Sequence, residues 1–228
     1  MILNPNKSKA LVISESRTVN PLHGDLVLSG VSICASPNLD ILCVKFDSRL
    51  TFEDHVRGIV SHVSQIIGIL RLVRLVFVDI SGLLRCYYAF VLKILEYCSP
   101  VWLSAAECHH QLLEGQVYSV VRLCPAQTFL SLCHQRHVTA LCMWYKVKSD
   151  SNHCLFSELP SASVRVRYTR AAAAAHLLEF EVSRCRTYQF ARCFLPAQTR
   201  VWNELPYTVF DTGTLDWFKG AVNRWLLP

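Results

Sequence analysis

The sequence predicts a mainly α-helical protein with a small N-terminal β hairpin, an α+β fold, on three observations. Of the 228 residues, 52% are hydrophobic and 18% are charged, a composition typical of a folded chain with a sizeable core and not of a disordered one. Glycine is sparse, with eight residues, so turns are few. Apolar residues recur three and four positions apart over most of the chain beyond residue 50, whereas strand-like patterns are confined to the residues before it.

The β elements are expected in the first fifty residues. A basic loop, NPNKSK, leads into a predicted strand at 10–14 (ALVIS). A turn around Pro21 and Gly24 precedes a short strand in LVLSG, and a further strand covers 41–47. Of the nearby stretches only 10–14 looks able to pair with 41–47, so we expect a small sheet built from these two segments.

The first helix begins at a predicted capping box, Thr51 with Asp54, and has two different faces. The apolar stripe consists of Val56, Ile59, Val63, Ile66, Leu70, Val73 and Phe77. The polar face consists of Arg57, Ser61, Ser64, Gly68 and Arg71. On these residues alone, a solvated face is the commoner interpretation. The alternative is a face that lies along a phosphate backbone, with a glycine that allows close approach.

Three further helices follow from the same periodicity. The second starts after Asp79 and ends before Pro100, because the residue preceding a proline is pushed out of the helical region. The third covers roughly 104–123 and the fourth 131–147. The composition then becomes polar and loop-rich, which predicts a domain boundary near 150. The predicted division is a β-containing segment at 1–50, a helical domain at 51–150 and a basic C-terminal region at 151–228.

A last helix is predicted at 214–226, with Thr214 as its N-cap. Its apolar stripe consists of Leu215, Phe218, Val222 and Leu226. We expect Trp202 and Leu205 to be its packing partners, and we prefer this structural role to any catalytic one.

The basic C-terminal region carries seven arginines between residues 161 and 203, against two acidic residues, Glu179 and Glu181, an excess of five positive charges. These arginines are Arg165, Arg167, Arg170, Arg184, Arg186, Arg192 and Arg200. Aromatic residues lie among them, namely Tyr168, Tyr188, Phe190 and Phe194. Arginine interleaved with aromatic residues is typical of nucleic-acid surfaces, but arginine also packs over aromatic rings in ordinary interfaces.

The cysteines predict reduced thiols and no metal site. Their number, eleven, is odd, and most lie inside apolar helical runs, as Cys86, Cys98, Cys124 and Cys142 do. One cluster could be considered as a set of metal ligands: Cys133, His134, His137 and Cys142, with Cys108, His109 and His110 upstream. No Cys-x-x-Cys pair occurs, and a structural zinc site normally uses such a pair. We therefore interpret the cluster as core thiols and surface histidines.

No membrane-spanning segment is predicted. The most apolar stretch, 59–78, contains Arg71 and Arg74 with His62 and Gln65, whereas a spanning helix needs about 20 residues with few or no charges. We expect no membrane partner.

Four phrases, in order along nearly the whole chain, resemble the C-terminal part of a reverse transcriptase, the RNA-directed DNA polymerase of a jockey-like non-LTR retrotransposon, a class of transposable element. They are LNPNKSKALVIS, LDILCVKFDSRLTFEDHV, YCSPVW and FLPAQTRVWNELPYTVFDTGTLDWFKGAV. The resemblance implies that 1–50 is the remnant of a palm edge, in which 39–48 is similar to the hairpin called the primer grip. It implies that 51–150 is a helical thumb, which clasps the primer–template duplex, and that 151–228 is a mixed C-terminal tail.

The resemblance also implies site residues. Lys7 matches a lysine that lies near the incoming nucleotide. The primer-grip-like residues are Val44, Phe46 and Asp47. The nucleic-acid-binding candidates are Arg57, Arg71 and Arg74 on the first helix, with Arg165, Arg167, Arg184 and Arg186 in the basic region. An RNA–DNA hybrid or another nucleic acid is the implied partner.

The sequence departs from the family pattern at several positions. Cys43 and Leu103 stand where the family usually has glycine, and Asp40-Ile41-Leu42 lacks the family's tyrosine. A side chain where the backbone must come close could displace the hairpin.

The chain is expected not to be an enzyme on its own. Two-metal nucleotidyl transfer needs paired carboxylates that hold Mg²⁺, and this chain contains no Asp-Asp pair. No cofactor is therefore expected here, and Mg²⁺ only for an intact parent polymerase. We expect a truncated fragment that retains thumb-type binding; the alternative is an inactive helical relic or a co-opted protein-interaction module without nucleic-acid binding.

Two further expectations concern behaviour in the cell. Val12, Val44 and Phe46 would normally pack on palm elements that lie upstream in the family, so we expect an exposed apolar edge through which the chain associates. No localisation run is convincing, and we expect an intracellular protein of the nucleus or cytoplasm.

Overall fold

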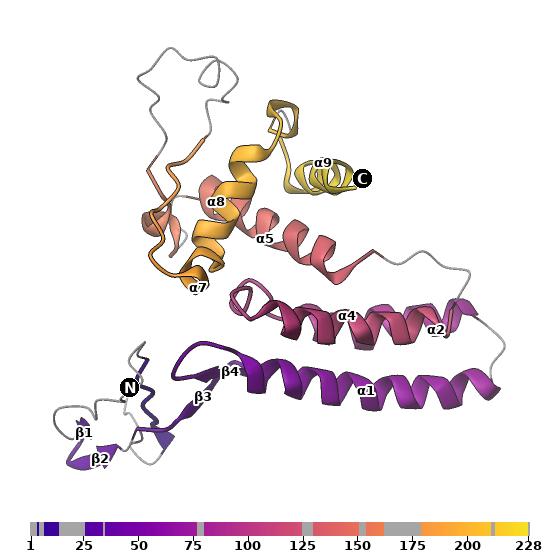
Figure 1. The fold of residues 1–228 in the computed structure, drawn as a ribbon, viewed down its shortest axis with the longest axis horizontal. Helices are drawn as coiled ribbons and strands as arrows, with labels where there is room; N and C mark the ends of the chain where they lie inside the picture. The colour runs from indigo at the N-terminus through magenta and orange to yellow at the C-terminus, as the bar shows by residue number, and fades with distance from the viewer. Residues whose placement is uncertain are drawn as a thin grey trace.

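The computed structural model describes residues 4, 7–13, 26–33, 35–76, 80–124, 130–150, 154–161, 179–210 and 213–227. Within these ranges the chain is mainly helical, with two small antiparallel hairpins near the N-terminus (Figure 1). The strands are β1 (Leu26–Leu28), β2 (Val31–Ile33), β3 (Asn38–Ile41) and β4 (Val44–Asp47). The helices are α1 (Glu53–Val76), α2 (Ile80–Cys86), the π-helical η2 (Tyr87–Leu92), α3 (Lys93–Glu96), α4 (Glu107–Val121), α5 (Leu132–Ser149), the 3₁₀ turn η3 (Phe156–Glu158), α7 (Tyr188–Ala191), α8 (Phe194–Glu204), the 3₁₀ turn η4 (Tyr207–Val209) and α9 (Leu215–Leu226).

The β3–β4 hairpin pairs Asn38 with Asp47 and Ile41 with Val44 through a two-residue turn. The expectation that 10–14 pairs with 41–47 is therefore wrong: in the described part of that segment, Ala10 only bridges Ala35. The strand at 44–47 pairs with the adjacent segment 38–41 because closing a two-residue turn costs less chain entropy than closing a loop of some thirty residues. The strand predicted in LVLSG is present as β1, and it pairs with β2.

The turn between β4 and α1 is organised by Asp47. Its carboxylate accepts hydrogen bonds from the backbone N–H groups of Arg49 (2.9 Å), Thr51 (3.1 Å) and Phe52 (2.7 Å), and from the Thr51 hydroxyl (3.1 Å). The predicted pairing of Asp54 with Thr51 in a capping box is wrong. The Asp54 carboxylate instead accepts a hydrogen bond from the side chain of Asn38 in β3 (3.3 Å). The hairpin and the helix are thus joined by several hydrogen bonds to the partly buried carboxylate of Asp47.

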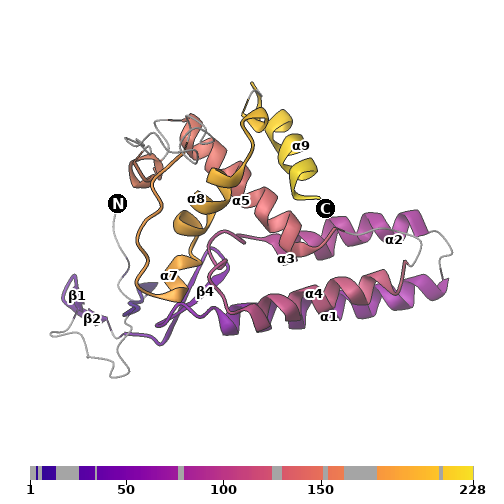
Figure 2. The same ribbon diagram turned by 45° about the horizontal axis from the view of Figure 1, so that its top comes forward.

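The first core lies between α1, the segment formed by α2, η2 and α3, and α4. The chain runs out along α1, returns antiparallel through α2, η2 and α3, and runs out again along α4 (Figures 1 and 2). The predicted apolar stripe of α1 is buried at Val56, Ile59, Val63 and Leu70. Ile67 is fully buried where Ile66 had been expected, and Ile66 is only partly buried. The predicted Phe77 lies outside the described residues.

The expectation that Val44 and Phe46 are exposed is wrong. Val44 is 2% exposed inside the first core, and Phe46 packs edge-on against Phe52, with ring centroids 5.6 Å apart. Both residues find their partners on α1 and the turn before it. Val12 is partly buried. The exposed apolar residues of this region are others: Ile13, Leu26, Val27, Val31, Ile41 and Leu42.

The second predicted helix is present in modified form. It begins at Ile80 and ends at Glu96, three residues earlier than expected, because Tyr97 has extended backbone angles. Its middle, Tyr87–Leu92, is π-helical. Periodicity over a 17-residue window cannot detect such a local change of winding, since the flanking segments keep their α-helical pattern.

The second core joins α5 to the C-terminal helices. Trp144 of α5 packs against Trp202 of α8, and Trp202 lies 5.8 Å from Phe218 of α9. The predicted N-cap and stripe of α9 are confirmed: Thr214 accepts the N–H of Trp217, and Phe218 and Val222 are fully buried. α5 contributes to both cores, since its first residue, Leu132, belongs to the first.

One helix among the described residues, over Glu53–Leu75, is long and apolar enough to cross a membrane by length and composition alone. Of this stretch, 28% is buried inside the protein, and the buried part is the apolar stripe that packs in the first core.

Candidate nucleic-acid interface

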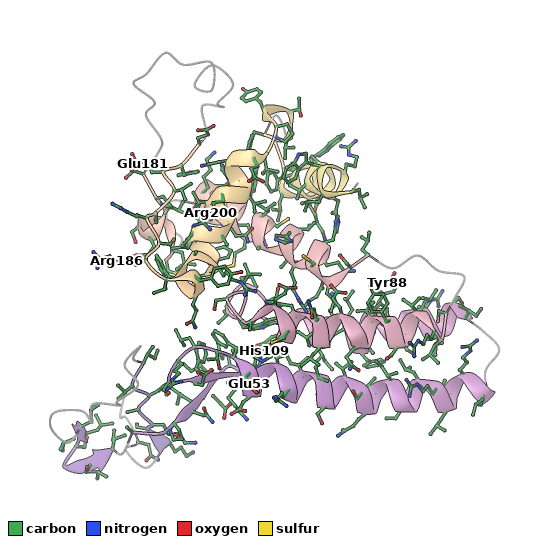
Figure 3. The ribbon with its side chains drawn as sticks, in the orientation of Figure 1. Glu53, Tyr88, His109, Glu181, Arg186 and Arg200 are labelled. Atoms are coloured by element: carbon green, nitrogen blue, oxygen red, sulfur yellow. The ribbon has the colours of Figure 1, made fainter. Side chains whose placement is uncertain are left out.

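The polar face predicted on α1 lies on the surface. Arg57, Ser61, Ser64 and Arg71 are exposed. Arg57 forms an ion pair with Glu53 one turn earlier, at 2.7 Å, and Ser64 donates a hydrogen bond to Gln116 of α4 at 3.0 Å. The bond from Ser64 shows that α4 borders this face. Figure 3 labels Glu53 at the start of the helix.

The spacing of the two arginines suits an extended ligand. Fourteen residues separate Arg57 from Arg71, which corresponds to about 21 Å along a helix axis. The two guanidinium groups therefore place positive charge at two separate points of one exposed face.

Arg74 is placed differently. Its Nη1 donates a hydrogen bond to the carbonyl oxygen of Arg122, just beyond the end of α4, at 3.3 Å. Helical spacing turns it toward α4 and away from Arg57. Arg74 thus has a structural partner at a helix C-terminus, where a positive charge also stabilises the exposed carbonyl groups.

No contact or backbone angle within the described residues requires glycine at position 68. A Cβ built on it meets no atom within 4 Å, and its φ is not in the left-handed region. A glycine inside an exposed helix costs about 0.5–1 kcal/mol relative to alanine. Gly58 on the same helix and Gly115 on α4 have equally open Cβ positions, so open space alone does not distinguish Gly68.

The three residues assigned to the primer-grip-like hairpin all lie on β4. Val44 and Phe46 point into the first core, and Asp47 holds the turn into α1. Partial burial raises the pKa of Asp47, but the hydrogen bonds from Thr51, Phe52 and Arg49 outweigh burial and lower the pKa below its usual value. Asp47 is therefore ionised at neutral pH, and its role in this structure is to orient the hairpin against the helix.

A pocket of about 650 Å³ lies between this hairpin, the first half of α1 and α3. Lys45 and Lys93 line it together with Asp40 and Asp54, so its fixed charges balance. His55 lies at its wall, and burial, followed by the charge of Lys45, lowers the pKa of this histidine, with Asp40 opposing. A neutral His55 keeps the pocket without net charge at neutral pH.

The remaining predicted residues lie apart from α1. Lys7 is exposed on the N-terminal segment. Arg184 and Arg186 are exposed on the irregular segment before α7, and Figure 3 labels Arg186 on the C-terminal half of the molecule, away from Glu53. Arg165 and Arg167 lie outside the described residues.

One contact that the sequence did not indicate connects the two halves. Gln189 of α7 donates hydrogen bonds to the carbonyl oxygens of Arg49 and Leu50, each at 2.8 Å. The turn before α1 is therefore held by Asp47 from within and by the C-terminal region from outside. A glutamine in a basic, aromatic stretch carries no sequence signal for a contact 140 residues away.

The Cys–His cluster does not form a metal site in the part of the chain that the structure describes, where no three His, Cys, Asp or Glu side chains gather as ligands. His134 bonds instead to Asn223 of α9 (3.0 Å), and Cys133 Sγ lies 3.5 Å from His137 Nδ1. The ten cysteines in the described ranges are free thiols. Of the four expected in the core, Cys124 is buried, whereas Cys86, Cys98 and Cys142 are partly buried.

Comparison with known proteins gave no match: no family model, no curated protein and no solved structure matches this chain.

Proposed function

We propose that the chain is the C-terminal part of a non-LTR retrotransposon reverse transcriptase and that it binds a primer–template duplex, such as an RNA–DNA hybrid, along α1. The observation that carries the proposal is the exposed face of α1, with two arginines about 21 Å apart, two serines and a glycine whose Cβ position is open. The arginines provide positive charge for phosphates, Ser61 provides a hydroxyl donor, and Gly68 allows close backbone approach on one surface.

The hairpin supports the same proposal. β3 and β4 are joined rigidly to the start of α1 through Asp47, and Tyr97 donates a hydrogen bond from its hydroxyl to the carbonyl oxygen of Leu42 in the hairpin turn (3.0 Å). A hairpin fixed at the end of a duplex-binding helix can hold a primer end in register with the duplex. In this proposal Val44 and Phe46 anchor the hairpin from below and do not touch nucleic acid.

The proposed activity is binding without chemistry. The chain contains no Asp-Asp pair for two-metal catalysis, so Mg²⁺ belongs to an intact parent polymerase in this proposal. Lys7, Arg184 and Arg186 remain candidates for secondary contacts, because all three are exposed and basic.

A second candidate function is a protein-interaction module without nucleic-acid binding. It is favoured by the exposed apolar side chains of the two hairpins, Leu26, Val27, Val31, Ile41 and Leu42, of which Leu42 is 79% exposed. Apolar hairpin edges of this kind pair with other chains. The two candidate functions differ in the expected effect of salt. The affinity of a duplex held through phosphate contacts falls steeply as the salt concentration rises, whereas an interaction module without nucleic-acid binding shows no such affinity.

The test is the affinity of the purified chain for a labelled RNA–DNA hybrid across a salt series, measured by fluorescence anisotropy. Arg57→Ala/Arg71→Ala is expected to reduce the slope of log K against log salt by about 1.4–1.8, since each phosphate contact contributes about 0.7–0.9. The matched control is Lys219→Ala/Arg224→Ala, which removes the same charge from exposed positions on α9. Equal slopes for the two double variants, or no binding by the wild-type chain, would contradict the proposal.

A further inference from the structure

Arg136 of α5 is a buried cation without an anionic partner. Its side chain is 3% exposed, its guanidinium lies 4.9 Å above the ring of Trp102, and its Nη1 bonds to His110 Nδ1 at 3.0 Å. Burial lowers the pKa of Arg136 to about 10, so the group is still charged at neutral pH. Among the described residues no carboxylate lies in ion-pair distance of it.

The unused edge of this guanidinium has a defined geometry. Nε and Nη2 are both buried and have no hydrogen-bond partner in the described part of the chain. These two nitrogens point their N–H groups in parallel, which is the arrangement that binds a carboxylate with two hydrogen bonds. Leaving such donors buried and unpaired is costly, and the cost is relieved when an anion binds.

A second buried polar group lines the same cavity. Gln198 of α8 is fully buried, and both its amide nitrogen and its amide oxygen lack a partner among the described residues. Arg136 and Gln198 both line a pocket of about 450 Å³ between α4, α5 and α8. Figure 3 labels Arg200, a further lining residue, on the α8 side. Two unpartnered polar side chains from different helices thus converge on one cavity.

The charges around the pocket select the kind of anion. Arg192 and Arg200 line it on the α8 side, whereas Glu107, Glu114 and Glu204 also line it. With Arg136 the three positive charges balance the three negative ones. A dianionic phosphate would be repelled by the three carboxylates, whereas a singly charged planar carboxylate matches the free edge of one guanidinium.

We propose that this pocket is a binding site for a small molecule that carries a carboxylate, held by Arg136 Nε and Nη2 and by the amide of Gln198. The carboxylate accepts two parallel hydrogen bonds from Arg136 and one from the Gln198 amide nitrogen, and the Gln198 oxygen accepts a donor of the ligand. The site lies between α4, α5 and α8, away from the exposed face of α1, and it does not depend on duplex binding.

The test is a titration of the full chain with propionate, followed by NMR through the Nε–H resonance of Arg136 and the side-chain NH₂ resonances of Gln198. Propionate is expected to shift both sets of resonances saturably, and its neutral analogue propionamide is not. Gln198→Leu, which keeps the side-chain volume, is expected to weaken propionate binding about tenfold. An equal response to propionamide, or no saturable shift with propionate, would overturn the proposal, and tighter binding of inorganic phosphate would overturn the choice of carboxylate.

A second variant separates binding from folding. Arg136→Met replaces the buried cation with an uncharged side chain of similar length, so the ligand-free protein is expected to keep or raise its thermal midpoint while losing propionate binding at Gln198. If Arg136 served only the fold, Arg136→Met would lower the midpoint strongly, and wild-type protein would not be stabilised by propionate. That pair of results would assign Arg136 to packing and refute the site.

Discussion

Two residues in the turn between β3 and β4 have backbone angles that side chains disfavour. Leu42 and Cys43 have φ values of +48° and +66°, which is the conformation of a two-residue hairpin turn that normally uses Asn-Gly. Cys43 stands where the resembling family usually has glycine, so the departure noticed in the sequence falls at a position where the structure also favours glycine. The residue was identified from the sequence, and its backbone strain only from the structure.

Cys43→Gly is expected to stabilise the protein by about 1 kcal/mol, because glycine adopts a left-handed conformation without the Cβ clash. Urea denaturation measures the change. The control is Cys108→Gly within α4, which should destabilise by about 0.3 kcal/mol, since glycine is a poorer helix former than cysteine. A loss of stability in Cys43→Gly would contradict the strained turn.

His110 predicts a pH dependence of stability. Burial, followed by the charge of the adjacent Arg136, lowers its pKa to about 4; Arg192 acts in the same direction, while the hydrogen bond to Leu103 and the charge of Glu107 oppose it. Because Nδ1 accepts a hydrogen bond from Arg136, Nε2 carries the proton and donates to the carbonyl oxygen of Leu103.

A histidine with a depressed folded-state pKa contributes stability above its unfolded value of 6.5, and this contribution is lost as the pH falls toward 4. We expect the free energy of unfolding to drop by about 2–3 kcal/mol over this window. Thermal unfolding of wild type and His110→Gln measures it, and the variant should lose most of the pH dependence. His62→Gln, at an exposed position of α1, should keep it; an unchanged profile in His110→Gln would be the contrary result.

At the scale of elements, the helices could be predicted where periodicity and caps agree. The stripe and N-cap of α9 follow from its sequence, as do the two faces of α1, because both depend on local spacing. The resemblance implied a hairpin at 39–48, and the structure has a hairpin there, but the residues alone predicted only the strand at 41–47, because the turn has neither glycine nor asparagine in its two central positions. The π-helical η2 was missed because its residues are ordinary helix residues.

Gly68 provides a prediction for α1 that separates folding from binding. Gly68→Ala is expected to raise stability by about 0.5–1 kcal/mol, since the added Cβ meets open space and alanine favours the helix. It is also expected to weaken binding of an RNA–DNA hybrid, because the methyl group lies where the duplex approaches. Urea denaturation measures the change in stability, and fluorescence anisotropy of a labelled hybrid measures the change in affinity, both on the same samples.

Gly115→Ala in α4 is the matched control, because its added Cβ also meets nothing within 4 Å. It should gain stability without losing affinity for the hybrid. A loss of affinity in both variants, or in neither, would argue against close approach at Gly68.

At the scale of the whole molecule, the two cores are linked along α5, and polar contacts reinforce the link. Arg192 forms an ion pair with Glu107 at 3.6 Å, and Gln189 bonds to the turn before α1. None of these could be predicted from the sequence, because each joins residues far apart whose local patterns are unremarkable in composition. The pocket of Arg136 and Gln198 was missed for the same reason: a buried arginine inside an apolar-periodic helix looks like a surface position in sequence.

The central claim is that a nucleic-acid duplex lies along the exposed face of α1, and photocrosslinking tests it most directly. A benzophenone amino acid placed at Ser61 is expected to crosslink to a bound RNA–DNA hybrid, while the same group at Trp217, which is 67% exposed on α9, is not. Irradiation at low salt followed by denaturing electrophoresis gives the yields. Strong crosslinking from 61 alone would place the duplex on α1; equal yields from both positions, or none from 61, would contradict the claim.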